Sequence, residues 1–219
     1  MIAGGTDQLP HMKANLIVGE MDPSRIGVAC RAVSHELIPH FQAQPGAAHG
    51  YWMVNRTTGE VLVLTIWEDE EALATARATP GANRANVAER TGLGIRVVQI
   101  MDVLDSKEPG LTLTAAARWA RVTWFDDGWP DRRKGRPAER REAVADERRR
   151  PGFCGSYLLG DPATRAGLAL SFWDGPSGTP DETREVSTHR VGSTANRIGE
   201  FESLGVAATA RPGPPYPPT

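Results

Sequence analysis

Two stretches of the sequence place small or polar side chains and an indole on one face of a predicted strand. The residues are Val63, Thr65 and Trp67 in EVLVLTIW, and Ala169, Ser171 and Trp173 in GLALSFW. Alternate residues of a strand share a face, and small groups beside an aromatic wall leave room for a small organic molecule. We therefore expect Val63, Thr65 and Ser171 to contact a ligand. The alternative is that both tryptophans only fill the core.

The opposite face of each run carries only large apolar side chains. These residues are Leu62, Leu64 and Ile66 in the first run, and Leu168, Leu170 and Phe172 in the second. We expect this face to be filled core, so a cavity is easier to build on the other side of the sheet.

Other polar residues near the two runs are candidates for ligand contacts. Tyr51 occurs again as Tyr157, which fits either a hydroxyl that lines a site or a ring that packs in a sheet. His49 lies close to Tyr51 and Asn55, and it either hydrogen-bonds a phenolic ligand or lies in a surface loop. His189 lies in a predicted helix, where it is either functional or solvated.

Motifs for metal, nucleotide and nucleophile chemistry are missing from the sequence. His35 and His40 in SHELIPH are five residues apart with Pro39 between them, about 140° around a helix, so they do not form a zinc motif. Cys30 and Cys154 do not fall on equivalent positions of the two stretches and are predicted to be free thiols. There is no Gly-rich phosphate loop or nucleophile elbow, so we expect no metal and no nucleotide cofactor.

The two stretches belong to an internal repeat. Pro45 to Glu68 (PGAAHGYWMVNRTTGEVLVLTIWE) superposes without a gap on Pro151 to Asp174 (PGFCGSYLLGDPATRAGLALSFWD) when 106 is added to each number. This register matches a Pro-Gly pair, a Tyr and a Trp, which indicates a duplicated unit.

Hydrophobic periodicity predicts the helices and strands that position these residues. In the first copy we expect a strand at 14–21, a helix at 23–44 kinked by Pro39, strands at 50–55 and 60–67, a helix from Glu70 broken at Pro80-Gly81, and a strand at 95–104. This order is βαββαβ, the ferredoxin-like arrangement. The second copy repeats it, with strands at 117–125, within 151–174 and at 201–208, and helices at 138–150 and 181–196. We divide the chain into a first repeat at 13–105, a linker at 106–116, a second repeat at 117–208 and a Pro-rich tail at 209–219.

The composition limits the expected partners. The chain has 219 residues, 40% of them hydrophobic, which is enough for a core in each repeat. Its net charge of −2 gives no general attraction to nucleic acid or to an anionic membrane. The Arg-rich run at 131–150 has no interleaved aromatic residues, so we expect a solvated helix face there. No apolar run is long enough to span a bilayer and no leader is evident, so we expect a cytoplasmic protein.

These features together resemble the antibiotic biosynthesis monooxygenase family. The resemblance rests on the Pro-Gly pair before the second strand and on the third-strand Trp followed by an acidic helix start in TIWEDEEALATA. Members of this family are dimeric α+β barrels. The resemblance therefore implies an α+β fold in which two tandem ferredoxin-like (βαββαβ) repeats pair as an intrachain dimeric α+β barrel. The molecule would then be a pseudo-dimeric monomer or a homodimer.

The resemblance also implies a pocket between the helices and the sheet, with Trp67 and Trp173 on its walls. It implies cofactor-independent oxygenation of an aromatic, polyketide-type substrate, in which the substrate supplies the electrons. The alternatives are a non-catalytic ligand-binding or interaction module and a haem-binding protein.

The residues carried over from the family are incomplete in each copy. Haem-degrading relatives use an Asn on the first strand, the third-strand Trp and a His on the second helix. The first copy has Asn15 and Trp67 but Ala76 at the His position, and the second has Trp173 and His189 but Arg121 at the Asn position. We therefore expect no resident haem. The catalytic candidates are Asn15, Tyr51, Trp67, Trp173 and His189, and the candidate substrate contacts also include Asn55, His49 and Arg121.

The first copy is expected to hold the better pocket. Its first helix has a regular apolar stripe, whereas residues 138–150 offer few apolar side chains to cover a sheet. We expect Trp119, Trp124 and Trp129 to cover the sheet of the second copy instead.

Overall fold

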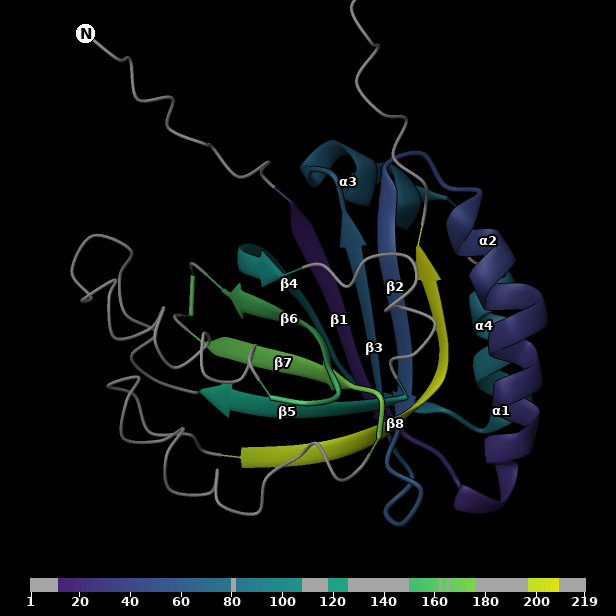
Figure 1. Ribbon diagram of the computed structural model, residues 1–219. Helices are drawn as coiled ribbons and strands as arrows, with labels where there is room; N and C mark the ends of the chain where they lie inside the picture. Colours follow the sequence, from purple (N-terminus) through teal and green to yellow (C-terminus); the bar gives the residue numbers. More distant parts are fainter. Residues whose placement is uncertain are drawn as a thin grey trace, which may run out of the picture.

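Eight strands of the described residues, four from each copy, form the framework of the computed structural model (Figure 1). The first copy contributes β1 (Lys13–Glu20), β2 (Ala47–Val54), β3 (Glu60–Trp67) and β4 (Gly94–Lys107). The second copy contributes β5 (Trp119–Phe125), β6 (Phe153–Gly160), β7 (Gly167–Trp173) and β8 (Arg197–Ala208). The structure describes residues 12–79, 82–107, 118–125, 150–161, 163–164, 166–175 and 197–208.

The strands close into one antiparallel barrel in the order β1-β3-β2-β8-β5-β7-β6-β4. Within each copy the outer strands are the second and the fourth, and the copies join where β2 pairs with β8 and where β4 pairs with β6. Each join uses the second strand of one copy and the fourth strand of the other. The tandem ferredoxin-like repeats and their closure into a barrel within one chain are therefore confirmed.

The same tight turn precedes the second strand of each copy. Gly46 and Gly152 both have positive φ angles, 70° and 80°. Their carbonyl oxygens accept hydrogen bonds of 2.9 Å from the backbone N–H of Glu68 and Asp174, respectively. A left-handed backbone favours glycine because it has no Cβ. The Pro-Gly pair of the repeat is thus a conformational requirement in both copies.

The inner faces of the strands fill the barrel with apolar side chains. Leu62, Leu64 and Ile66 lie there and are fully buried, with their counterparts Leu168, Leu170 and Phe172. The filled face predicted from the sequence is confirmed. Burial of a Leu or Ile side chain contributes about 1.5–3 kcal/mol each, so this inner cluster is a main source of stability.

Two tyrosines join the copies at the centre of this inner core. The hydroxyl of Tyr51 donates a 3.3 Å hydrogen bond to the hydroxyl of Tyr157, its counterpart in the other copy. The ring of Tyr51 also stacks on Phe172, with 4.3 Å between the ring centroids. The polar atoms of the pair satisfy each other inside an apolar core, which is how buried polar groups avoid a desolvation cost.

A single helical rod covers part of the outer face of the sheet. It consists of η1 (Pro23–Arg25), α1 (Ile26–Ala32), η2 (Val33–Leu37) and α2 (Ile38–Gln42). Asp22 caps its start by accepting a 2.8 Å hydrogen bond from the backbone N–H of Ser24, and Pro23 occupies the first turn. The apolar stripe of the rod packs on the sheet through Ile26, Ala29, Val33 and Phe41.

Pro39 was expected to kink the helix, and the helical irregularity lies in the turn before it. Val33–Leu37 forms a π-helical turn, in which the backbone N–H of Ile38 donates to the carbonyl of Val33. Proline has no N–H to donate, and its ring needs room against the preceding turn. A widened turn provides that room and keeps the rod continuous up to Gln42, two residues short of the predicted end.

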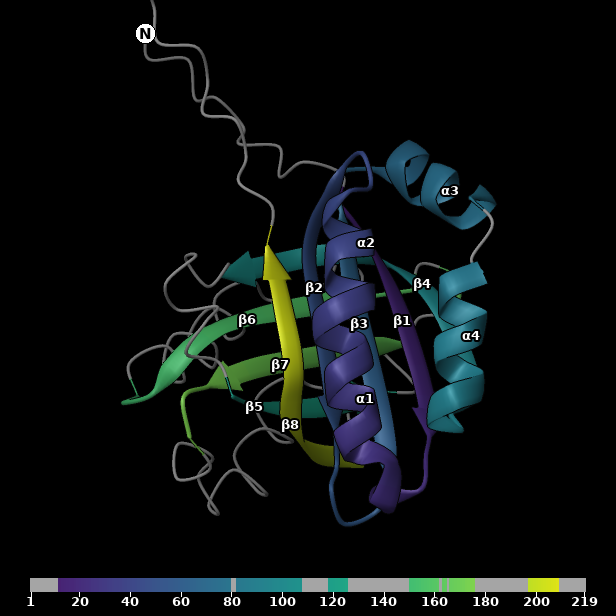
Figure 2. The same cartoon turned by 90° about the vertical axis from the view of Figure 1, so that its right-hand side faces the viewer.

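Two further helices of the first copy, beside the rod, cover more of the outer face of its sheet (Figure 2). Helix α3 (Glu70–Ala78) is capped by Asp69, whose carboxylate accepts a 2.8 Å hydrogen bond from Ala72 N–H. Helix α4 (Ala82–Thr91) ends at Gly92, which has φ of 68°. An ion pair between Arg90 and Glu36, with 2.6 Å between Nη2 and Oε2, links α4 to the π turn. None of the helices in the described part of the chain is long and apolar enough to cross a membrane.

Strand boundaries differ from the prediction where pairing between the copies extends a strand. β2 begins at Ala47 rather than Gly50, because its first residues pair with β3 and β8. β4 continues to Lys107, so Ser106 and Lys107 belong to the sheet and not to the linker; they pair with Tyr157 and Ser156 of β6. Residues 108–116 of the predicted linker, residues 138–149 of the helix predicted at 138–150, the helix predicted at 181–196 and the tail at 209–219 lie outside the described residues. The exact bounds of the two repeats stay a prediction.

One of the three tryptophans that were expected to cover the sheet of the second copy lies elsewhere. Trp124 packs against the inner core, with its ring centroid 6.2 Å from that of Phe201, so it lies inside the barrel and not over its outer face. The alternation of β5 places Ala120 and Val122 on the same inner face. Trp129 lies outside the described residues.

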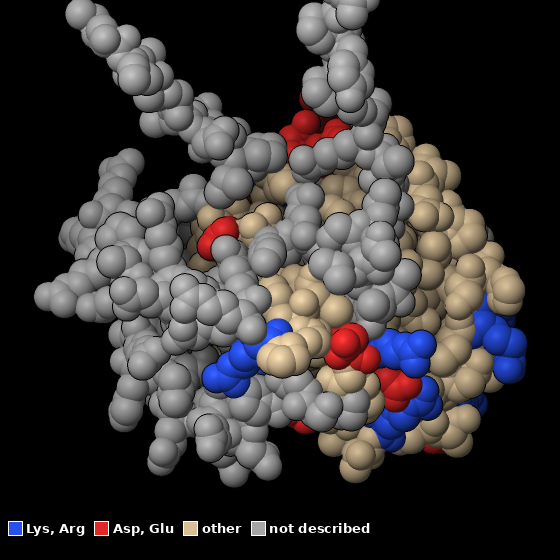
Figure 3. All heavy atoms as spheres, in the orientation of Figure 1, with Lys and Arg blue, Asp and Glu red and all other residues tan. Residues whose placement is uncertain are grey.

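Charged side chains are mixed on the face shown in Figure 3. The basic and acidic residues drawn there alternate along the lower part of the molecule and do not separate by sign. The described part of this face therefore offers no continuous basic surface of the kind that nucleic acid requires. The Arg-rich run at 131–149 lies outside the described residues.

The helical rod of the first copy lies directly against a strand of the second. Helices α1, η2 and α2 contact β8. At Gly205 of β8, a Cβ atom would lie 2.7 Å from Val33 Cγ1 and 2.8 Å from Ile38 Cδ1. Both distances are shorter than normal carbon contacts. The close packing of rod and strand therefore requires a residue without a side chain at position 205.

Gly205→Ala is therefore expected to lower the free energy of unfolding by about 1–3 kcal/mol, the usual effect of overpacking. Gly27→Ala is the matched control, because Gly27 lies in α1 and a Cβ there meets nothing within 4 Å. Removal of a helical glycine should raise stability by about 0.5–1 kcal/mol. Urea unfolding of both variants measures the two changes. Equal effects of the two substitutions would show that the rod does not pack on β8 as described.

Candidate functional site

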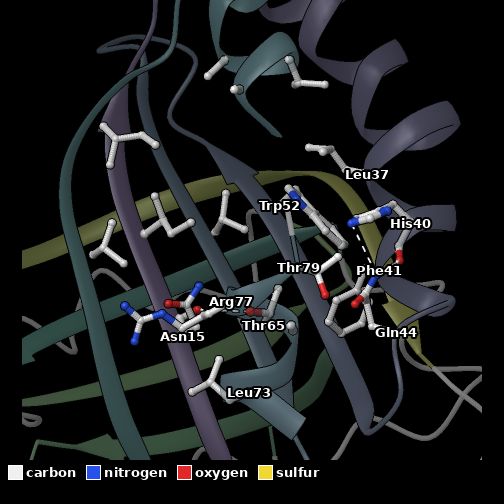
Figure 4. Close-up of a pocket in the computed structure, with 18 of the residues that line it drawn as sticks. Asn15, Leu37, His40, Phe41, Gln44, Trp52, Thr65, Leu73, Arg77 and Thr79 are labelled. Carbon is white, nitrogen blue, oxygen red and sulfur yellow. Dashed lines mark hydrogen bonds between the residues drawn. The ribbon is translucent and has the colours of Figure 1, made fainter. Parts of the chain in front are cut away.

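A cavity of about 520 Å³ lies in the first copy between its helices and the outer face of β1, β3 and β4 (Figure 4). The helical rod, α3 and α4 form one side of it, and the sheet forms the other. The volume is within the range of sites for small organic molecules. The cavity lies in the copy and on the sheet face that the sequence indicated.

Aromatic rings form one wall of the cavity. Phe41 packs edge-on against Trp52, with 5.8 Å between ring centroids and 81° between ring planes, and against Trp67, with 5.3 Å and 74°. Trp52 and Trp67 project from the outer faces of neighbouring strands, and Phe41 comes from α2. Edge-to-face contacts of this kind fix ring positions, so the wall is rigid before a ligand binds.

The indole of Trp67 is held by a hydrogen bond within its own strand. Its Nε1–H donates to Thr65 Oγ1 at 3.1 Å, and the Thr65 hydroxyl lies 3.5 Å from the backbone carbonyl of Asn15. Residues 15 and 65 are direct partners in the β1–β3 ladder, which brings these groups together. The second copy repeats the bond, because Trp173 Nε1–H donates to Ser171 Oγ at 3.1 Å.

The side chain of Asn15 has an unsatisfied oxygen. The residue is 9% exposed, lines the cavity, and its Oδ1 atom is buried without a hydrogen-bond partner. A buried polar atom without a partner costs about 1–3 kcal/mol, and most such atoms in folded proteins are paired. This amide is thus available to accept a hydrogen bond from a ligand.

Further polar groups line the cavity from the helices. His40 and Gln44 lie on the rod or directly after it, with Gln44 Nε2 3.4 Å from His40 Nε2. When the amide donates this bond, the imidazole carries its proton on Nδ1. Thr79 and Arg77 line the cavity from the end of α3. In Figure 4, Asn15, Thr65 and Arg77 lie toward one end, and His40 and Gln44 lie toward the other.

An ion-pair cluster fixes α3 to the sheet beside this site. Lys13 Nζ lies 2.8 Å from Asp102 Oδ1 in β4 and 3.4 Å from Glu70 Oε2 at the start of α3. The hydrogen bond to the Asp102 carboxylate, with a smaller contribution from Glu70, raises the pKa of the Lys13 ammonium. Exposed ion pairs contribute little stability, so this cluster adds only weakly to the packing of α3 on the sheet.

The structure brings together only some of the residues predicted for the site. Asn15, Val63, Thr65 and Trp67 all line the cavity. Tyr51 does not line it, because it lies on the inner face of β2 and bonds Tyr157.

His49 and Asn55 also lie away from the cavity. His49 is inside the barrel, where its ring centroid is 6.5 Å from that of Tyr51. Asn55 organises the turn between β2 and β3, where its Oδ1 accepts from Thr57 N–H at 2.9 Å and its Nδ2 donates to the Glu200 carbonyl at 3.2 Å.

Sequence reasoning missed most residues that the helices contribute. Trp52 was detectable, because it alternates with Tyr51 on β2 and therefore faces outward, where it pairs with Val63. Phe41 belongs to the apolar stripe expected from the sequence, which predicted its packing on the sheet but not its place in a site. His40 and Gln44 follow the π turn, which changes the rotation of the helix. A regular 3.6-residue pattern does not predict that change. Arg77 gave no distinguishing signal in the sequence.

The second copy repeats the indole, and an aromatic ring packs on it there. Trp173 is 1% exposed and packs edge-on against Phe153 at 5.4 Å between ring centroids. Arg121 stands at the position of Asn15, and its guanidinium lies 3.5 Å from Glu200 Oε1. His189 lies outside the described residues, so its role stays a prediction.

The residues of the first copy do not fit a haem ligated as the family implies. Ala76 stands at the helix position of the iron-ligating His, and its methyl group lines the cavity. His40 is on a different helix, and its Nε2 lies against Gln44. Within the described ranges, no three His, Cys, Asp or Glu residues are grouped to hold a metal ion.

Comparison with solved structures finds the same fold over almost the whole chain. An anthrone oxidase-like protein matches with a TM-score of 0.58 at 14% identity, over 93% of this chain and 95% of that protein. A proposed monooxygenase from Fusobacterium nucleatum subsp. nucleatum ATCC 25586 matches with a TM-score of 0.60 at 12% identity, over 92% and 96%.

A haem-binding protein from Thermus thermophilus matches with a TM-score of 0.55 at 12% identity, over 89% of this chain and 92% of that protein. This chain has the fold of a tandem dimeric α+β barrel. The resemblance to antibiotic biosynthesis monooxygenase-like barrels is thus confirmed for the fold. No family model and no curated protein matches the sequence. At these identities, the likeness to other tandem dimeric α+β barrels establishes architecture and not reaction.

Asn15→Leu is expected to stabilise this tandem dimeric α+β barrel. Leu has the same number and branching of side-chain heavy atoms, the cavity beside it can take its larger methyl groups, and it removes the unpaired buried amide oxygen, so the free energy of unfolding should rise by about 1–2 kcal/mol. Thr65→Val is the contrasting variant. It removes the acceptor of the Trp67 indole N–H and should lower stability by about 1–3 kcal/mol. Chemical denaturation measures both. If Asn15→Leu were clearly destabilising, Asn15 would be a structural residue rather than a ligand contact.

Proposed function

We propose that the cavity of the first copy binds an aromatic small molecule and supports its cofactor-independent oxygenation. The observation that carries the proposal is the unpaired buried amide oxygen of Asn15 in a cavity with a rigid aromatic wall. An aromatic ligand with a hydroxyl group satisfies both features, because its ring packs on the wall and its hydroxyl donates to Asn15.

The proposed reaction draws its electrons from the substrate. A methylene group activated by flanking phenolic rings loses a proton, and the resulting carbanion transfers electrons to dioxygen and forms a hydroperoxide. Loss of water then leaves a carbonyl group, so that CH2 and O2 give C=O and H2O. The substrate is oxidised by four electrons and dioxygen is reduced by four, and no further reductant is needed.

The protein supplies a base, orientation and an apolar cavity wall. His40 is the proton acceptor in this scheme, because the described lining contains no carboxylate, and its Nε2 takes the proton when the substrate displaces the Gln44 amide from that nitrogen. Asn15 and Trp67 orient the rings, and hydrogen-bond donors at the cavity stabilise the developing anion. Positioned bases of this kind contribute about 10²–10⁴ in rate.

A non-catalytic binding module is the second candidate. It is favoured by the scarcity of acid–base groups, because His40 and Arg77 are the ionisable side chains among the described lining residues. A binding module requires the aromatic wall and Asn15 but does not require His40.

Oxygen uptake with a panel of hydroxylated anthrones and naphthols tests the enzymatic proposal. We expect uptake by the wild-type chain, and a fall of about 100-fold or more in His40→Asn with little change in substrate Kd, because the base is lost and the wall is not. His35→Asn is the control, since His35 lies on the same rod but does not line the cavity.

The outcomes separate the two candidates. Binding of panel members without oxygen uptake rejects the enzyme and leaves the binding module. Uptake that is equal in the wild type and His40→Asn rejects His40 as the base.

A further inference from the structure

We infer that the cavity selects an aromatic anion and that Arg77 determines this selectivity. The inference rests on the proposed function, because it names the class of ligand for the same cavity. It adds a charge requirement that neither the aromatic wall nor Asn15 imposes.

The charge balance around the cavity supports this inference. Of the described residues that line it, Arg77 and His40 are ionisable and none is Asp or Glu. The nearby carboxylates form ion pairs with other cationic side chains. Glu36 pairs with Arg90, and Glu70 and Asp102 pair with Lys13. Arg77 forms no ion pair with any described residue, so no carboxylate of the described part of the chain neutralises its positive charge.

The location of Arg77 allows it to reach a ligand in the cavity. It lies in the last turn of α3, whose Leu73 and Ala76 pack into the outer core. That packing holds the helix in place. Arg77 is itself exposed and lines the cavity. A guanidinium in this position can donate two parallel hydrogen bonds to a carboxylate while its charge remains solvated.

Asn15 supplies an independent indication of what the ligand carries. Its buried Oδ1 requires a hydrogen-bond donor, and Figure 4 places Asn15 and Arg77 toward the same end of the cavity. A donor and an anion at one end of a planar ring describe an aromatic carboxylate with a neighbouring hydroxyl group. The apolar remainder of the ring system then lies on the wall formed by Phe41, Trp52 and Trp67.

Calorimetric titration of the full chain with three matched probes tests the inference. The probes are 3-hydroxy-2-naphthoate, its neutral methyl ester, and 2-naphthoate, which lacks the hydroxyl. We expect the hydroxy acid to bind at least about 10-fold more tightly than its ester, because hydrogen bonds to a charged group exceed neutral ones. We also expect 3-hydroxy-2-naphthoate to bind more tightly than 2-naphthoate. In the Asn15→Leu variant this difference in Kd should disappear.

The decisive variant is Arg77→Gln, with Arg31→Gln as the control. Arg77→Gln should abolish the preference for the acid over the ester and leave the Kd of the ester within about two-fold. Arg31 is exposed on α1 and does not line the cavity, so its replacement should preserve the preference. A variant that weakens acid and ester equally would reveal a structural role for Arg77 and would overturn the inference.

The probes also separate this inference from the proposed function. If the ester and the acid bind the wild-type chain equally well, the charge requirement is rejected, and the aromatic cavity stands. If none of the three probes binds, the aromatic cavity and the charge requirement are both rejected.

Discussion

Pairing of β2 with β8 and of β4 with β6 is the constraint on which the rest of the molecule depends. Each copy on its own would leave two strand edges and one apolar sheet face unpaired, which favours association. Joining the copies satisfies both edges and buries both inner faces in one core. Once the inner face is filled in this way, a ligand site has to form on the outer face, where helices cover the sheet incompletely.

The duplication shows how the surroundings of the repeated indole differ between the two copies. Trp67 and Trp173 make the same hydrogen bond to a hydroxyl two residues earlier. Their ladder partners differ, however, because Ala47 lies opposite Trp67 and Phe153 lies opposite Trp173. The phenyl ring of Phe153 packs on the indole in the second copy. In the first copy a methyl group stands there, and the space beside the indole remains open.

Much of the fold was predictable because repeats and strand alternation are local signals. Strand β3 matched its predicted bounds, and its two faces divided into filled core and cavity as expected. Tyr51 was misleading as a site candidate, since its repetition reflects the central contact between the copies and not a ligand. His40 and Gln44 were missed because the π turn at Val33–Leu37 changes the helix rotation, and Arg77 was missed because it reaches the site only through tertiary packing.

The central claim is that the ligand binds on the outer face of the first copy. A crystal structure of the full chain with 2-naphthol bound tests it most directly. The account predicts density for the ring beside Phe41 and Trp67, with the naphthol hydroxyl within hydrogen-bond distance of Asn15 Oδ1. Density inside the barrel near Tyr51, or beside Trp173 in the second copy, would contradict it.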